Sequence, residues 1–331
     1  MRCTTGSLTQ WPQERIDAEC RSAYAAYEKE LRDHYTGYFA QYSALRCPRQ
    51  AYSAATLVAA LPPGWGHLQR LLPRQSVHRY ARSGKSSQTL ALALLGAAIH
   101  QDVTLEALWR TLGIGGSHAQ AAQIAFEYAL DPSDLQEEPR VTTLDFLAST
   151  THAVAVFECK WSERGFGSCS CLKDGDGSPQ PGNTCASRVD ARNAYWRTAY
   201  RDFGLLPARL QRSFCPMSVA YQPIRNVAAT RLLSGGRRGV FVLLYDDANP
   251  YFRQTGTWPG WPALLNAAIE TSLDLTFKAI SWQSLMSALP VPTDVRRWAV
   301  EKHRLPAGNG VSGACSQSVE RQSLIGRPGV Y

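Results

Sequence analysis

Two short apolar segments, 141–148 and 152–161, constrain the fold of this chain more than any other feature of its sequence. Both are rich in β-branched and aromatic residues, and only Ser149-Thr150-Thr151 lies between them. Runs of this length and composition, bounded by turn-forming residues, are typical of β-strands. A linker of three residues favours an antiparallel return, so we expect the two segments to form a hairpin.

Further strands and helices are expected on both sides of this hairpin. The continuous apolar run 239–245 has the length of a buried strand. Residues 126–130 are either a third strand before the hairpin or the end of a helix over 119–125. Apolar periodicity predicts helices at 14–45, 86–99, 105–112, 190–203 and 216–233, and two or three helices with one strand near 274–280 within 261–304. An α/β fold, with a mixed central sheet flanked by helices, packs this order of elements economically.

Proline and glycine divide the chain into three expected parts. Between residues 48 and 75 they interrupt the helical pattern and predict a connector without regular structure. Residues 1–75 are therefore expected to be a helical N-terminal extension with its connector, and residues 76–305 the α/β domain. The polar segment 306–331 is expected to be a flexible tail.

The charge of the chain favours a polyanionic partner. Its 331 residues include 35 Lys+Arg and 27 Asp+Glu, a net charge of +8, which attracts nucleic acid by steering and counterion release. Seven arginines lie between residues 201 and 240 with one acid, although a solvated surface would explain them equally well. The chain shows no secretory signal and no membrane-spanning segment. We expect a cytoplasmic protein without membrane contact, and the sequence leaves open whether it forms a homodimer.

Three charged residues interrupt the predicted hairpin. Asp145 and Glu158 are equally distant from the Thr151–His152 bond, so an antiparallel hairpin brings them to neighbouring positions. Glu158 and Lys160 are two residues apart on one strand and therefore face the same side. Charges among apolar strands are costly unless they pair or bind a ligand. The pattern predicts a buried polar site, with a structural ion pair as the main alternative to a catalytic one.

These residue types suit metal-dependent hydrolysis of a phosphodiester. Mg²⁺ or Mn²⁺ prefers oxygen ligands and retains water for a substrate phosphate. We expect Asp145 and Glu158 to bind the ion, with the backbone carbonyl of Cys159 as a third protein ligand. Lys160 would orient the attacking water or offset charge in the transition state.

With these residues in place, the chain resembles a known group of enzymes. Asp145 and the sequence Glu158-Cys159-Lys160, in the order helix, strands, helix, strand, are similar to the PD-(D/E)xK nuclease superfamily, which has the restriction-endonuclease-like fold. The superfamily has a proline where this chain has Leu144.

More narrowly, residues 80–250 resemble a group of bacterial proteins classed as restriction endonucleases. The motifs that carry this resemblance are Ser86-Ser87-Gln88, Phe126-Glu127, Leu144-Asp145-Phe146, Phe157-Glu158-Cys159-Lys160-Trp161-Ser162-Glu163 and Tyr221-Gln222-Pro223-Ile224-Arg225-Asn226. The resemblance implies metal-dependent cleavage of DNA by Asp145, Glu158 and Lys160. It also implies supporting positions for Glu127 and Gln222.

Two further sets of residues are candidates for binding. Soft thiolates select zinc or an iron–sulfur cluster, and four thiols in or near a glycine-rich segment predict such a second site: Cys169, Cys171, Cys185 and Cys215. Four independent thiols are the alternative. The candidate contacts to DNA are Lys85, Arg225, Arg231 and Arg237. For the whole chain, a non-catalytic DNA-binding module with a nuclease-like fold and a structural protein with a cysteine-bound metal remain alternatives to a nuclease.

Overall fold

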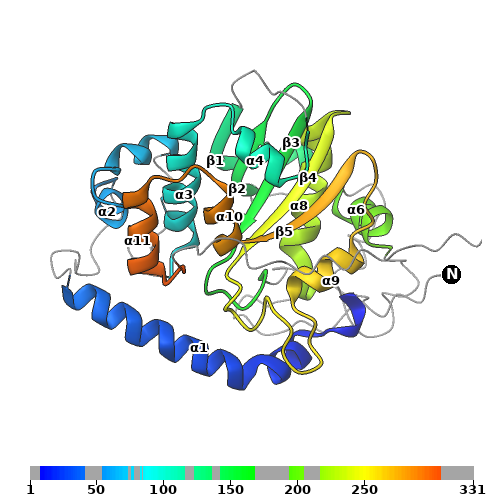
Figure 1. The fold of residues 1–331 in the computed structure, drawn as a ribbon. Helices are drawn as coiled ribbons and strands as arrows, with labels where there is room; N and C mark the ends of the chain where they lie inside the picture. The colour runs from blue at the N-terminus through cyan, green and yellow to red at the C-terminus, as the bar shows by residue number, and fades with distance from the viewer. Residues whose placement is uncertain are drawn as a thin grey trace, which may run out of the picture.

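A computed structural model describes residues 8–41, 54–73, 76–77, 83, 85–115, 123–135, 142–167, 194–204 and 217–306. In this part of the chain the strands form one five-stranded sheet in the order β1-β2-β3-β4-β5, which is flanked by helices (Figure 1). The strands are β1 (Gln123–Ala129), β2 (Thr143–Ser149), β3 (Ala153–Cys159), β4 (Arg238–Tyr245) and β5 (Leu275–Ser281). Strands β1, β2 and β3 pair antiparallel, whereas β3, β4 and β5 pair parallel. The expected α/β fold with a mixed sheet is confirmed.

The predicted hairpin forms with the expected register. Phe146 of β2 pairs with Phe157 of β3, so the turn is centred on the Thr151–His152 bond. Strand β2 alternates between buried and half-buried residues, because one of its faces packs on the core. Strand β3 is buried along its whole length, as expected for the middle strand of a covered sheet.

The predicted helix over 119–125 is wrong where the structure describes it. Residues 123–125 begin strand β1, which pairs with β2 from Gln123 to Ala129. Phe126 packs against Phe146 across the two strands, with ring centroids 4.7 Å apart. These cross-strand contacts outweigh the local helical preference of an alanine-rich segment. The alternative expectation, a third strand at 126–130, is confirmed.

The helices match most of the other predicted segments. In chain order these helices are α1 (Gln13–Gln41), α3 (Ser87–Gln101), α4 (Glu106–Thr111), α6 (Ala194–Phe203), α8 (Met217–Ser234), α9 (Trp261–Ala268), α10 (Trp282–Ala288) and α11 (Thr293–His303). Two further short elements are η1 (Leu8–Gln10) and α5 (Pro132–Leu135). Helix α3 begins as predicted, because the side chain of Ser86 accepts a hydrogen bond from the Thr89 N–H. Among the described residues, no helix combines the length and apolar character needed to cross a bilayer.

The proline-rich connector contains regular structure, contrary to prediction. It holds helix α2 (Ala54–Ala60) and the 3-10 helix η3 (Gly66–Leu71). Leu68 of η3 is buried, and a side chain on Gly96 of helix α3 would come within 3.3 Å of it. The glycine therefore allows the close approach of η3 to α3, and burial of leucine stabilises this short helix despite its neighbouring prolines.

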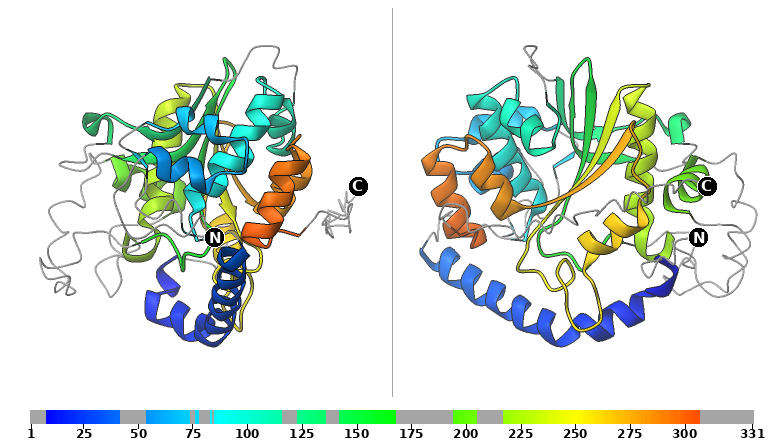
Figure 2. Two further views of the ribbon diagram at one scale, coloured as in Figure 1. Left: turned by 90° about the vertical axis from the view of Figure 1, so that its left-hand side faces the viewer. Right: turned by 45° about the vertical axis from the view of Figure 1, so that its right-hand side comes forward.

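Helix α1 runs along one side of the molecule, beyond the loops at one end of the sheet (Figures 1 and 2). Its buried face consists of Ile16, Cys20, Tyr24, Tyr27, Leu31, Tyr35 and Tyr38. All of these residues except Tyr38 belong to one hydrophobic cluster with apolar residues of the sheet. This cluster therefore includes side chains from both sides of the predicted boundary at residue 75. The three predicted domain limits remain predictions, and residues 307–331 of the predicted tail lie outside the described residues.

Helix α11 buries a lysine, Lys302, that forms no ion pair with a carboxylate in the described part of the chain. Lys302 is 2% exposed, donates a hydrogen bond of 2.7 Å to the Ala60 carbonyl and lies 4.8 Å from the ring centroid of Trp298. Burial lowers the pKa of Lys302 to about 7, because the charged form loses its hydration. The folded protein therefore carries a buried charge below this pH.

We predict that Lys302→Met raises the melting temperature most at low pH. In the unfolded chain Lys302 keeps its proton up to about pH 10.4, so the cost of its burial is full below pH 7 and declines as the pH rises from about 7 to 10. The gain should amount to roughly 2–4 °C for each kcal/mol relieved, and thermal unfolding at pH 6.5 and 9.5 measures it. Lys29→Met, at an exposed site on α1, is the control. A gain from Lys302→Met that does not change with pH would contradict this account.

Candidate active site

Three carboxylates lie in one row across the antiparallel part of the sheet. Glu127 lies between two residues that pair with Phe146 and Leu144, which places it opposite Asp145. On the other side of β2 the register places Asp145 next to Glu158. The Cys159 N–H donates a hydrogen bond of 2.6 Å to Asp145 Oδ2 and joins the two strands at this point. The predicted convergence of Asp145 and Glu158 is therefore present in the structure.

Glu127 adopts an unusual backbone conformation within strand β1. Its φ is +51°, in the left-handed region that non-glycine residues seldom occupy in strands. Such a conformation costs on the order of 1–3 kcal/mol and is concentrated at functional sites. The side chain is buried, and Glu127 Oε1 accepts a hydrogen bond of 2.6 Å from Gln88 of helix α3. The sequence analysis gave Gln88 no role, although it lies in the first turn of a predicted helix, two residues after the N-cap Ser86.

Glu158 and Lys160 form a buried ion pair. The Lys160 ammonium lies 2.7 Å from Glu158 Oε1 and donates a second hydrogen bond of 3.0 Å to Gln222 Oε1. The other oxygen of Glu158 accepts a short hydrogen bond from the side-chain amide of Asn226. Both charged side chains are almost fully buried. Gln222 lies in contact with this pair, and its supporting role stays a prediction.

Helix α8 supplies both amide side chains. Gln222 and Asn226 are four residues apart and therefore lie on one face of the helix, which packs against β3 and β4. The helix is kinked at Ala220, whose φ is −120°, and Pro223 follows the kink. A proline is tolerated there because the first turn of a helix has no intrahelical partner for its N–H. Asn226 is fully buried. The sequence analysis gave Asn226 no role. The pattern that could have indicated one is the spacing of four residues from Gln222, which places both amides on one face of the predicted helix.

The charges in this row act strongly on one another. Burial raises the pKa of the Asp145 carboxyl well above its usual range, and the charges of Glu158 and Glu127 raise it further, against the opposing effect of Lys160. Burial also raises the pKa of Glu127 to about 7, with the Gln88 hydrogen bond opposing and the charge of Glu158 assisting. For Lys160, burial alone would lower the pKa, but the charges of Glu158, Glu163 and Asp145 raise it. The lysine therefore remains an ammonium group at neutral pH.

The row holds more negative than positive charge, and this surplus fits a divalent cation. Three acids face one ammonium group, and a cation would relieve the repulsion that raises the pKa values of Asp145 and Glu127. Among the described residues, no three side chains of His, Cys, Asp or Glu are gathered as ligands of one ion. Asp145 and Glu158 therefore remain the predicted ligands, since two carboxylates with backbone oxygen and water are a common way to bind Mg²⁺.

The chain after Lys160 is fixed close to helix α3. The Trp161 N–H donates to Glu163 Oε2 over 2.6 Å, and the Ser87 hydroxyl donates to Glu163 Oε1 over 2.9 Å. Ser87 and Gln88 are neighbours in the first turn of α3, so this turn contacts Glu163 and Glu127 together. The sequence analysis gave Glu163 no role.

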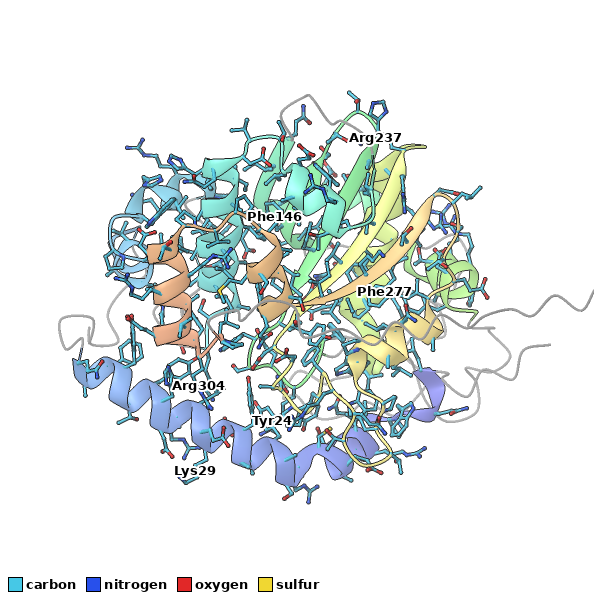
Figure 3. All side chains as sticks on the ribbon, viewed as in Figure 1. Tyr24, Lys29, Phe146, Arg237, Phe277 and Arg304 are labelled. Carbon is cyan, nitrogen blue, oxygen red and sulfur yellow. The ribbon has the colours of Figure 1, made fainter. Side chains whose placement is uncertain are left out.

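The four predicted DNA contacts fall into two groups. Lys85, just before α3, pairs with Glu28 of α1 at 2.8 Å, and Arg225 donates to the Thr143 carbonyl at the start of β2 over 3.3 Å. Both lie at the end of the sheet that holds Glu158. Arg231 pairs with Asp202, and Arg237 donates to the Thr150 carbonyl in the hairpin turn. These two lie at the opposite end, as the position of Arg237 in Figure 3 shows.

The four cysteines of the predicted second metal site lie outside the described residues, and the structure does not test that site.

Comparison with known proteins identifies the family. A family model described as "Restriction Endonuclease associating with ARP" matches residues 44–301, which is more than half of the chain and includes every described residue of the site. No curated protein and no solved structure shows a significant match. The match agrees with the mixed sheet and the flanking helices described above. This chain belongs to the family of restriction endonucleases associating with ARP.

Proposed function

We propose that this protein is a metal-dependent endonuclease that hydrolyses phosphodiester bonds of DNA, with an active site of the PD-(D/E)xK type. One observation carries the proposal. In a chain of a restriction-endonuclease family, Asp145 and Glu158 meet at the end of the β2–β3 hairpin, and Lys160 contacts the second of them. A structural ion pair needs one acid for one base, whereas this site places three acids beside one lysine, with Glu127 and Glu158 buried and Asp145 half-buried.

Asp145 and Glu158 would hold Mg²⁺ or Mn²⁺, with the carbonyl group of Cys159 as a further ligand. Both oxygens of Glu158 already accept hydrogen bonds, but each carboxylate oxygen has a second lone pair available for a metal. A bound ion would polarise a phosphoryl oxygen and lower the pKa of a coordinated water molecule. Asn226 and Lys160 orient the Glu158 carboxylate for this purpose.

Lys160 acts in this proposal as a hydrogen-bond donor and a fixed positive charge. Its raised pKa keeps it protonated, so it does not serve as the base that removes a proton from water. Its ammonium group instead stabilises negative charge that develops on the phosphate in the transition state. Gln222 holds the ammonium group at 3.0 Å, and Glu127 supports the site from the next strand as a buried acid.

DNA is the proposed substrate. The family description supports a nuclease of the restriction type, and the net charge of +8 favours a polyanion. Lys85 and Arg225, which lie at the same end of the sheet as Glu158, are the predicted contacts that can reach phosphates beside the scissile bond. Arg231 and Arg237 remain predicted contacts, but only for DNA that extends to the opposite end of the sheet.

We predict that Asp145→Asn and Glu158→Gln each reduce cleavage of supercoiled plasmid at least about 100-fold, which is a typical loss for a group that stabilises the transition state. Asp145→Asn keeps the side-chain shape and removes one charge from a crowded acidic row, so its melting temperature should not fall. Glu158→Gln keeps the shape but removes the charge that pairs with the buried Lys160, so its melting temperature should fall, and its cleavage is measured at a temperature at which it is folded. Alanine at Glu158 is less suitable, because it would leave the buried Lys160 without its partner.

The matched control for these variants is Asp274→Asn. Asp274 is exposed and precedes β5 at the other end of the sheet, so its variant should cleave at the wild-type rate. A folded Asp145→Asn protein that cleaves like the wild type would refute the assignment. DNA binding without cleavage at every Mg²⁺ concentration would favour the non-catalytic DNA-binding alternative.

We also predict that Mg²⁺ stabilises the folded protein in the absence of DNA. An ion that binds only the folded chain stabilises it by about 2.7 kcal/mol at a hundredfold excess over its dissociation constant, so the melting temperature should rise with Mg²⁺ concentration. The rise should be lost in Asp145→Asn and retained in Asp274→Asn. Equal shifts in both variants would place the ion elsewhere.

The cysteine site gives a separate prediction. If Cys169, Cys171, Cys185 and Cys215 hold a structural metal, elemental analysis of the purified protein should find about one zinc ion or one iron–sulfur cluster per chain. Replacement of Cys185 by serine should release it. Protein that contains neither zinc nor iron would favour four independent thiols.

A further inference from the structure

Most hydrogen bonds to the turn that follows Lys160 come from residues of other segments of the chain. The Lys160 N–H still belongs to the sheet and donates to the Leu244 carbonyl over 2.8 Å. The Lys160 carbonyl accepts a hydrogen bond of 2.9 Å from the Trp282 indole. From Trp161 onward the chain leaves the sheet, and its carbonyl groups point to residues far away in the sequence. The position of Lys160 therefore depends on those residues.

Helix α1 provides two of these contacts through tyrosine hydroxyls. Tyr24 donates a hydrogen bond of 2.7 Å to the Ser162 carbonyl. Tyr27 lies 3.3 Å from the Trp161 carbonyl and 2.8 Å from Asp246 Oδ2. A third hydroxyl, of Tyr35, accepts a hydrogen bond of 2.9 Å from the Trp161 indole. All three tyrosines are buried, and they lie more than 120 residues before the turn that they contact.

The spacing of these tyrosines gives the helix one continuous face toward the turn. Positions 24, 27 and 35 follow steps of three and eight residues, which return to the same side of a helix. Packing alone would be satisfied by phenylalanine at each position. A hydroxyl that reaches a buried carbonyl matters because an unpaired buried carbonyl costs free energy and leaves its peptide free to move.

We propose that helix α1 is a positioning element of the active site, in which Tyr24 and Tyr27 hold the carbonyl groups of Ser162 and Trp161 and so fix the turn that places Lys160 and Glu163. This inference rests on the proposed nuclease function and extends it to a helix outside the residues 80–250 that carry the motif resemblance. The two tyrosines touch neither the metal ligands nor the scissile bond, so they act through the turn.

The turn connects directly to the groups of the site. Glu163 accepts hydrogen bonds from Trp161 and Ser87, and its charge helps to raise the pKa of Lys160. Asn249 adds hydrogen bonds to the carbonyls of Trp161 and Glu163 at 3.2 and 2.9 Å. When Tyr24 and Tyr27 lose their hydroxyls, the Ser162 carbonyl loses its tyrosine donor and the Trp161 carbonyl keeps only Asn249. The turn then gains freedom beside the catalytic lysine.

The test is the double variant Tyr24→Phe/Tyr27→Phe of the full chain, with each single variant as a milder form in case the double variant does not fold. We expect kcat for plasmid cleavage to fall about tenfold or more, since displacement of a catalytic group by 1 Å can cost a hundredfold. KM for DNA should change by less than about twofold, because the phosphate contacts are retained. Hydrogen exchange of the peptide 160–167 should become faster.

Tyr251→Phe is the matched control. Tyr251 is a buried tyrosine whose hydroxyl donates a hydrogen bond of 2.7 Å to Asp17 of α1. Among the described residues, this hydroxyl forms no hydrogen bond to residues 160–163. Loss of the Tyr251 hydroxyl should lower the melting temperature about as much as loss of the Tyr24 or the Tyr27 hydroxyl. The value of kcat and the hydrogen exchange of peptide 160–167 should remain unchanged. An equal loss of kcat in this control would show that α1 acts only through stability.

The two proposals fail in different ways. If the wild type does not cleave DNA with Mg²⁺ or Mn²⁺, the proposed function is wrong, and hydrogen exchange still tests whether the tyrosines fix the turn. If the wild type cleaves and Asp145→Asn does not, while the tyrosine variants keep the wild-type kcat and exchange rates, the positioning role of α1 is wrong and the nuclease assignment stands.

Discussion

The structure depends on the crowding of three acids, two buried and one half-buried, beside one lysine at the open end of a hairpin. A carboxylate in a protein interior loses its hydration, and like charges in adjacent strands add repulsion. The raised pKa values of Asp145 and Glu127 follow from both effects. Such an arrangement lowers stability, so it persists only where the surrounding contacts are strong enough to hold it. Lys160 offsets part of the charge and thereby makes the row tolerable in the folded protein.

The elements around the row each hold one of its members in place. Helix α8 presents amide groups to Glu158 and to Lys160, and the first turn of α3 presents Gln88 to Glu127. The backbone N–H of Cys159 holds Asp145. Side chains that bind these charged groups therefore come from segments 39 to 68 residues away in the chain, and the site exists only when the sheet and both helices have packed.

The sequence predicts the part of this site that is local. Strand alternation and a three-residue turn fix the register of Asp145 against Glu158, because both follow from counting along one hairpin. The partners from α8 and α3 required tertiary packing, and a motif resemblance located Gln222 but gave no role to Asn226. Glu127 was placed near the site, but its left-handed backbone was not predictable, since no local pattern requires a positive φ at glutamate. The prediction of a helix over 119–125 was wrong at residues 123–125 because pairing with β2, which is a tertiary contact, determined their conformation.

Helix α1 shows how a correct local prediction can leave the role of an element unknown. Its periodic tyrosines indicate a buried face, and burial is confirmed, but periodicity does not distinguish a ring that fills a core from a hydroxyl that holds a distant carbonyl. The distinction lies in the contacts of Tyr24 with Ser162 and of Tyr27 with Trp161. Because the sheet ends at Lys160, the lysine has a regular strand on one side only, and its other side must be fixed by packing. A long helix that packs along the end of the sheet supplies these contacts, and its two tyrosine hydroxyls bind specific carbonyl groups of the turn.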